Sequence, residues 1–161
     1  MSDLLNEFKA ESASLIEQML DLLTDCEAGT LLPNEAQKFG LYADRIMGTV
    51  KQLSISQGGG SEALGAIAKF TELCKILGYK CTQLPPNDGL WPVAVAVLLD
   101  STEELKQLIE NFEAEREAGA ISVTKTLLDR LQWLNEQFAD NIQGGVPMSQ
   151  VQILINTLKP S

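Results

Sequence analysis

One carboxylate in this chain stands in a setting that suggests chemistry. Asp44 lies in the segment GLYADRIMG, with Gly40 four residues before it and Gly48 four residues after it. The surrounding residues have helical periodicity, and each glycine within a helix costs roughly 0.5–1 kcal/mol relative to alanine. Glycines one turn below and one turn above the acid leave the backbone bare, so another surface can approach Asp44 closely. The spacing therefore indicates a docking point, tight packing of a neighbouring helix, or relief of a bend.

A second pair of polar residues also has helical spacing. Glu104 and Gln107 lie three residues apart, which places an acid and an amide on one face of a helix. Such pairs position water in some response-regulator phosphatases, but a chain rich in Glu and Gln also contains them by chance. The alternating acids of residues 113–117 point in different directions and predict a solvated surface, not a metal site.

The composition excludes several classes of catalytic site. The chain contains no histidine, which removes Ser–His and Cys–His nucleophile systems and most catalytic zinc sites. The glycine-rich segment 57–61 lacks the lysine and the preceding strand of a nucleotide-binding loop. Three widely spaced cysteines, Cys26, Cys74 and Cys81, predict small buried hydrophobic residues and neither disulfides nor a zinc site. We expect no enzyme activity, no metal and no cofactor.

The charge of the chain restricts its partners. Its 161 residues carry a formal net charge of −10. An acidic protein repels phosphate backbones and anionic lipids, so we expect neither a nucleic acid nor a membrane as partner. The longest apolar run, LWPVAVAVLL, is shorter than the roughly 18 residues of a membrane span, and MSDLLNEF does not resemble a secretory signal. The expected location is the cytoplasm.

The elements that must position Asp44 are helices, because apolar residues recur at spacings of three and four along the chain. Turn-forming Gly, Pro and Asn residues separate six such stretches. The run VAVAVLL could form a strand, but helical spacing continues after it without a breaker, so we expect a helix there. The predicted helices cover about 3–28, 35–56, 62–84, 91–117, 122–142 and 147–158.

The second of these helices carries Asp44. Asn34, followed three residues later by Gln37, is typical of a capping box at the start of a helix. Asp44 falls outside the apolar stripe, so we expect its side chain on the exposed side of the helix. The residues expected in the core are Phe39, Ala43, Ile46, Val50 and Leu53.

The number and length of the helices indicate the fold class. Four helices of 20 or more residues joined by mostly short turns predict an all-α fold, built as an antiparallel up-down four-helix bundle. This bundle would cover residues 1–117. Residues 118–161 would form a C-terminal extension of one or two helices, packed on or beside the bundle.

The run Ala43-Asp44-Arg45-Ile46-Met47-Gly48 lies in the middle of the second predicted helix. It resembles the A-H-x-[IL]-K-G pattern of the histidine phosphotransfer (HPt) domain family, and most closely the N-terminal phosphotransfer domain of chemotaxis-type histidine kinases. The stretch LGAIAKFTELCKIL resembles the family's third helix, and the resemblance covers about residues 3–140. The family's first-helix pattern, F-x-x-E-x-x-x-L-[IL], is matched by Phe8, Glu11, Leu15 and Ile16.

The chain departs from the family pattern at the two residues that carry its chemistry. Asp44 stands at the position of the phosphoacceptor histidine, and Met47 stands at the position of the lysine that helps to manage the phosphoryl charge. A carboxylate cannot form a phosphoramidate, and without the lysine the phosphoryl group loses its stabilising charge. An acyl phosphate of the receiver type would need a metal held by further acids and a lysine, and none is evident beside Asp44. The resemblance therefore implies a degenerate, or pseudo, phosphotransfer domain.

The function that this resemblance implies is protein binding in bacterial two-component or chemotaxis-like signalling. The partner would be the receiver domain of a response regulator or a histidine kinase. Two alternatives stay open, namely an unrelated helical-bundle interaction or structural protein whose glycines serve core packing, and a response-regulator phosphatase that uses Glu104 and Gln107. The expected binding surface consists of Gly40, Leu41, Asp44, Met47, Gly48 and Lys51.

Overall fold

The computed structural model describes residues 2–56, 62–112, 123–138 and 146–159. Within these ranges the chain is helical and contains no strand, so the prediction of an all-α fold is confirmed for the described residues. The elements are α1 (Ser2–Glu27), the 3-10 helix η1 (Pro33–Glu35), α2 (Lys38–Ser56), α3 (Glu62–Cys81), α4 (Leu90–Glu110), α6 (Lys125–Phe138) and α7 (Met148–Leu158).

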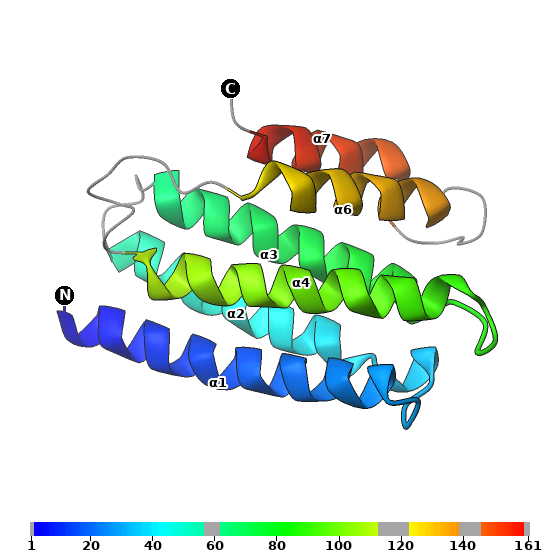
Figure 1. Ribbon diagram of the computed structural model, residues 1–161. Coiled ribbons are helices and arrows are strands. Elements are labelled where there is room, and N and C mark those ends of the chain that lie inside the picture. Colours follow the sequence, from blue (N-terminus) through cyan, green and yellow to red (C-terminus); the bar gives the residue numbers. More distant parts are fainter. Residues whose placement is uncertain (1, 57–61, 113–122, 139–145, 160–161) are drawn as a thin grey trace.

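The four N-terminal helices lie side by side around a common core (Figure 1). α1 packs against α2 and α4, and α3 packs against the same two helices. α6 and α7 pack against each other along one side of this group, where α6 contacts α3 and α4 and α7 contacts α3. None of the described helices is both long enough and apolar enough to cross a membrane.

The apolar stripe predicted for α2 is its buried side. Phe39, Ala43, Ile46, Val50 and Leu53 are all buried, which confirms this prediction. Because these five residues face α1 and α3, the opposite side of α2 is left to solvent. This orientation fixes which α2 residues a partner can reach.

The cysteines are buried and unpaired, as predicted for small hydrophobic residues. Burial raises the pKa of the Cys26 thiol to about 11 and that of Cys74 to about 12. Cys81 is also buried, and burial raises the pKa of its thiol as well. All three groups are therefore thiols at neutral pH, the form that is neither nucleophilic nor metal-binding.

The start of α2 differs from the prediction. The predicted helix began near residue 35 with Asn34 as its cap, whereas the chain first forms η1 and α2 begins at Lys38. Glu35 makes the capping contact instead, because its Oε1 accepts a hydrogen bond from the backbone N–H of Leu32 at 2.9 Å. The capping box assigned to Asn34 and Gln37 is therefore wrong.

Other predicted boundaries are partly outside the described residues. α3 ends at Cys81 and not at residue 84, since the backbone N–H of Leu84 bonds to the carbonyl of Cys81 in a separate turn. The glycine-rich segment 57–61, the acids of residues 113–117 and the predicted helix end at residues 139–142 lie outside the described ranges.

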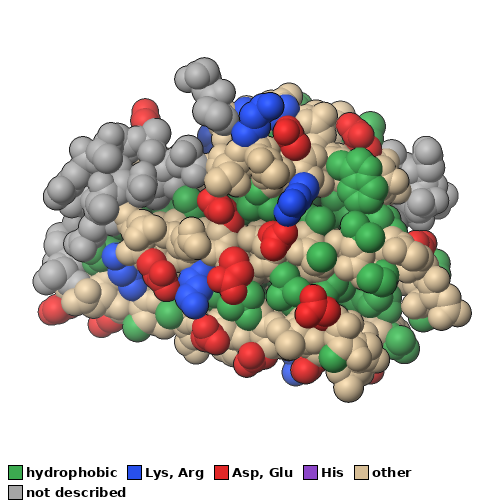
Figure 2. Space-filling model, viewed as in Figure 1, with side chains coloured by type: hydrophobic (Ala, Val, Ile, Leu, Met, Phe, Trp, Pro, Cys, Tyr) green, Lys and Arg blue, Asp and Glu red, His purple; other side chains and the backbone are tan. Residues whose placement is uncertain are grey.

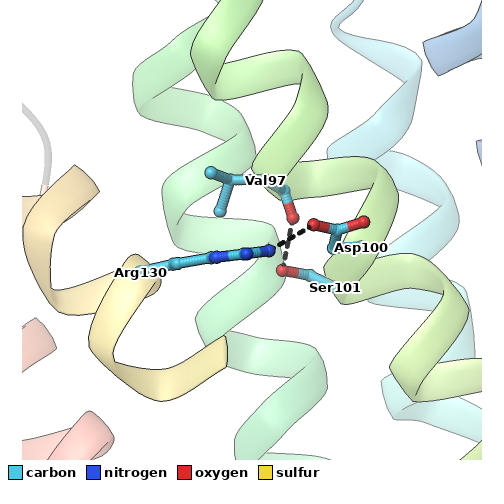
Figure 3. Close-up of polar contacts among 4 residues, drawn as sticks. All are labelled: Val97, Asp100, Ser101 and Arg130. Carbon is cyan, nitrogen blue, oxygen red and sulfur yellow. Dashed lines mark hydrogen bonds and ion pairs between the residues drawn. The ribbon is translucent and has the colours of Figure 1, made fainter. Parts of the chain in front are cut away.

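Polar contacts fix α6 against α4. Arg130 of α6 donates a hydrogen bond of 2.9 Å from Nη1 to Oδ2 of Asp100 on α4 (Figure 3). On the next residue, the Ser101 hydroxyl donates to the carbonyl of Val97 within α4 at 2.8 Å. One face of α4 is therefore covered by α6.

The charged side chains are unevenly divided among the helices. α1 carries seven acidic residues and one lysine, whereas α2 carries three basic residues and one acid. Figure 2 shows acidic side chains along the visible surface of α1 and α4. α2 is thus a locally basic helix within an acidic chain, which affects what can dock on it.

Candidate functional site

Asp44 lies on the solvent side of α2, near the middle of the helix, with its side chain 59% exposed. Lys75 of α3 donates a hydrogen bond of 2.8 Å from Nζ to Oδ1 of Asp44. This hydrogen bond and the positive charge of Lys75 lower the pKa of Asp44, and the charge of Lys51 acts in the same direction. Asp44 is therefore an ionised carboxylate held in an ion pair between two helices.

The lysine beside Asp44 is a residue that the sequence did not identify. The HPt pattern places a lysine at residue 47, where this chain has methionine, so the sequence indicated that positive charge was missing. The structure supplies this charge from α3, 31 positions along the chain. The only sequence signal was that Lys75 falls outside the apolar stripe of its helix. The expectation that no lysine accompanies Asp44 is wrong.

The glycines that flank Asp44 do not serve packing among the described residues. Within those ranges, a Cβ atom built on Gly40 or on Gly48 would meet no heavy atom within 4 Å outside its own helix. The alternative that a neighbouring helix of the bundle packs tightly against these two residues is therefore wrong. Both glycines leave open space on the outside of α2, one turn on either side of Asp44.

The glycine that does serve packing is Gly78 of α3. A Cβ there would lie 2.6 Å from Cε1 of the Phe39 ring, a distance at which atoms overlap. Gly78 was not among the predicted residues, although a glycine inside an otherwise apolar helix is a sign of close approach.

A groove of about 610 Å³ runs between α2 and α3 beside the ion pair. Its apolar wall includes two half-exposed side chains, Leu41 at 49% and Tyr79 at 51%. The groove can accept apolar side chains of a partner while the ion pair at its edge supplies polar contacts. The lining residues are Gln37, Gly40, Leu41, Asp44, Lys75, Ile76, Tyr79, Thr82 and Val146.

Only some of the residues predicted to form the binding surface lie together in the groove. Gly40, Leu41 and Asp44 line the groove. Gly48 and Lys51 are exposed farther along α2, outside the groove. Met47, which was also predicted, is half-buried and does not line it either. The surface is therefore centred nearer to the start of α2, and it extends onto α3.

The alternative catalytic pair is engaged in a structural contact. Glu104 is partly buried, and burial raises the pKa of its carboxyl, while a hydrogen bond from the backbone of Thr124 opposes this rise. Thr124 directly precedes α6, so Glu104 helps to hold the start of that helix. Gln107 is exposed. Across the described ranges, no three His, Cys, Asp or Glu residues are grouped so that they could hold a metal ion.

No protein-family model, curated protein sequence or solved structure matches this chain. The resemblance to the HPt pattern thus depends on the residues themselves. In the structure Ala43 and Ile46 are buried, and Gly48 is exposed. The first two anchor α2 in the core, and Gly48 keeps its outer side open beside Asp44.

Proposed function

We propose that this chain is a pseudo-phosphotransfer domain that binds a response-regulator receiver domain or a histidine kinase. In this proposal α1 to α4 form an HPt-type antiparallel up-down bundle over residues 1–117, and residues 118–161 extend it. The observation that carries the proposal is the exposed position of Asp44. It occupies the phosphoacceptor place of the family pattern, between two glycines with open space around them.

The proposed domain binds without passing on a phosphoryl group. Asp44 is anionic, and its Oδ1 is already hydrogen-bonded to Lys75. An incoming phosphoryl group would therefore meet a carboxylate whose neighbouring positive charge is already paired. The same ion pair makes Asp44 a weak mimic of phosphohistidine, since Lys75 offsets the one negative charge that Asp44 offers.

The groove supplies the contact area for binding. Leu41, Ile76 and Tyr79 present apolar surface between α2 and α3, and the Asp44–Lys75 pair lies at its edge. Apolar contacts at the centre with polar groups around them are the usual composition of a protein interface. The phosphatase alternative has less support than binding. It needs the Glu104 carboxyl for catalysis, and this carboxyl already accepts a hydrogen bond from the backbone of Thr124.

A phosphotransfer assay tests the proposed loss of chemistry. Incubation of the native chain with a kinase, ATP and the receiver domain should give no phosphorylated chain. The double variant Asp44→His with Met47→Lys restores the full family pattern and should become phosphorylated, with Asp44→Ala and Met47→Lys as the matched control. Stable labelling of the native Asp44 would refute the proposal, and so would a restored variant that neither binds the receiver nor accepts phosphate from it.

A single substitution separates binding from folding. Gly48→Arg adds a long side chain where there is open space, so the variant should keep its helical circular dichroism and melt no lower than the native chain. It should lose the receiver or kinase in a pull-down, while Ala13→Arg on exposed α1 keeps it. If Gly48→Arg unfolds the chain, the result favours the alternative of an unrelated structural protein whose glycines serve core packing.

A further inference from the structure

The outer side of α2 carries apolar residues that the described part of the chain leaves exposed. Leu41, Gly48 and Ile55 are seven residues apart, and such residues lie almost in one line along a helix. Leu41 is 49% exposed, and Ile55, at 77%, is the most exposed large hydrophobic side chain among the described residues. Gly48 lies between them with open space above it. We call this line of three residues the outer strip.

Oppositely charged residues flank the outer strip on its two sides. Asp44 lies on the side next to α3, where its Oδ1 contacts Lys75. Arg45 is the next residue, and it therefore lies on the side next to α1. Arg45 has no ion pair with any residue in the described ranges, and Oδ2 of Asp44 has no hydrogen bond there.

We infer that the outer strip pairs with the same strip of a second copy of this chain, with the two α2 helices parallel about a two-fold axis. In this arrangement each strip residue faces its own counterpart, and the small Gly48 lets the helices approach closely. The two-fold axis also brings the edge of one α2 helix that borders α3 next to the edge of the partner's α2 helix that borders α1. Asp44 then faces the partner's Arg45, and Arg45 faces the partner's Asp44, so the surface is self-complementary.

The overall distribution of charge favours the parallel arrangement. An antiparallel pair about Gly48 would place α1 beside the partner's α1, and each α1 carries seven acids and one lysine. The parallel pair places α1 beside the partner's α3, where Lys69 and Lys75 balance the two glutamates and Lys80 is buried, so the repulsion between two acidic helices is avoided. Opposite charges across an interface fix its register, and like charges disfavour the competing one.

The expected dimer is weak. The strip from Leu41 to Ile55 spans roughly 21 Å at 1.5 Å per residue, which is one helix contact. Small interfaces of this kind are transient, so a dissociation constant of roughly 10 µM to 1 mM is expected. Leu41 and Asp44 also belong to the groove, so a dimer and a docked partner would exclude each other. The dimer itself does not depend on the proposed function.

Cysteine cross-linking of the full chain tests this pairing directly. Mild oxidation should join two copies of Leu41→Cys, and likewise two copies of Ile55→Cys, because each residue faces its counterpart. The native cysteines are buried and give a low background, and Ala13→Cys on exposed α1 controls for random collision. Cross-linking no faster than in this control overturns the inference. Cross-linking only in a mixture of the two strip variants overturns the parallel arrangement.

Sedimentation equilibrium without any receiver provides the second test. The native chain should show an average mass that rises with concentration above that of the 17.5 kDa monomer. Asp44→Arg and Arg45→Asp should each weaken the dimer about tenfold, and the double variant should restore it. Lys125→Asp, exposed on α6 and outside the proposed interface, is a matched charge reversal that should leave the dimer intact. A double variant no stronger than the weaker single variant overturns the charge pairing.

Discussion

The ring of Phe39 on α2 lies directly against the backbone of Gly78 on α3. Both residues are buried, and a Cβ at Gly78 would stand only 2.6 Å from Cε1 of the ring. This close approach is part of the interface between the two helices that carry Asp44 and Lys75. The shape of the groove between α2 and α3 therefore depends on a glycine that lies outside it.

Gly78→Ala should destabilise the chain. The added methyl group must displace the Phe39 ring within a packed core, which costs roughly 1–3 kcal/mol of unfolding free energy. Urea denaturation followed by circular dichroism measures this loss. In a Phe39→Leu background the alanine should cost less, because the shorter side chain leaves room. Equal costs in both backgrounds would show that the ring is not the obstacle.

Gly40→Ala and Gly48→Ala should have the opposite effect. Both glycines are helical and face open space, so alanine adds helix propensity without a clash. Each substitution should stabilise the chain by roughly 0.5–1 kcal/mol. The urea midpoint should rise with an unchanged slope of free energy against urea. A lower midpoint for either variant would mean that its glycine makes a packing contact after all.

The Asp44–Lys75 pair should contribute little to stability. Its side chains are 59% and 41% exposed, so solvent screens the attraction to about 0.5 kcal/mol. A double-mutant cycle with Asp44→Asn and Lys75→Met measures this coupling. The pKa of Asp44 is below 3.8 in the folded chain, so the coupling is present above about pH 3.8 and is lost as the pH falls through the folded value. A coupling that stays constant down to pH 2 would contradict this assignment.

Lys80→Met should stabilise the chain at neutral pH. Lys80 is 4% exposed, and its one hydrogen bond in the described ranges reaches Oδ1 of Asn135 at a long 3.5 Å. Burial lowers the pKa of Lys80 below 10.5, so charging it opposes folding. Methionine keeps the length of the side chain without the charge, and a gain of about 1 kcal/mol is expected.

The pH dependence of this gain identifies its cause. The penalty from Lys80 is fully present below its folded pKa and disappears as the pH rises toward the unfolded value of 10.5. The advantage of Lys80→Met should therefore shrink as the pH rises from the lowered folded pKa toward 10.5, as measured by thermal unfolding across pH. Lys69→Met, which changes an exposed lysine, should alter stability by less than about 0.5 kcal/mol. A gain that does not vary with pH would point to packing and not to charge.

The sequence alone determined the helical class and the side of α2 that is buried. Phe39, Ala43, Ile46, Val50 and Leu53 are all buried as predicted, and Asp44 is exposed as predicted. Such features follow from the period of the apolar residues, because an amphipathic helix must turn that stripe to the core. The three buried cysteines follow from the same rule.

Only the tertiary structure decided which residues meet across helices. The contact of Asp44 with Lys75, the close approach of the Phe39 ring to Gly78 and the contact of buried Lys80 with Asn135 join distant positions of the chain. Periodicity shows which side of a helix is apolar, but it gives neither the axial offset nor the rotation of one helix against the next. The offset and the rotation depend on how side chains from several helices fit together at the same time. This fit is a property of the packed core and not of any one helix.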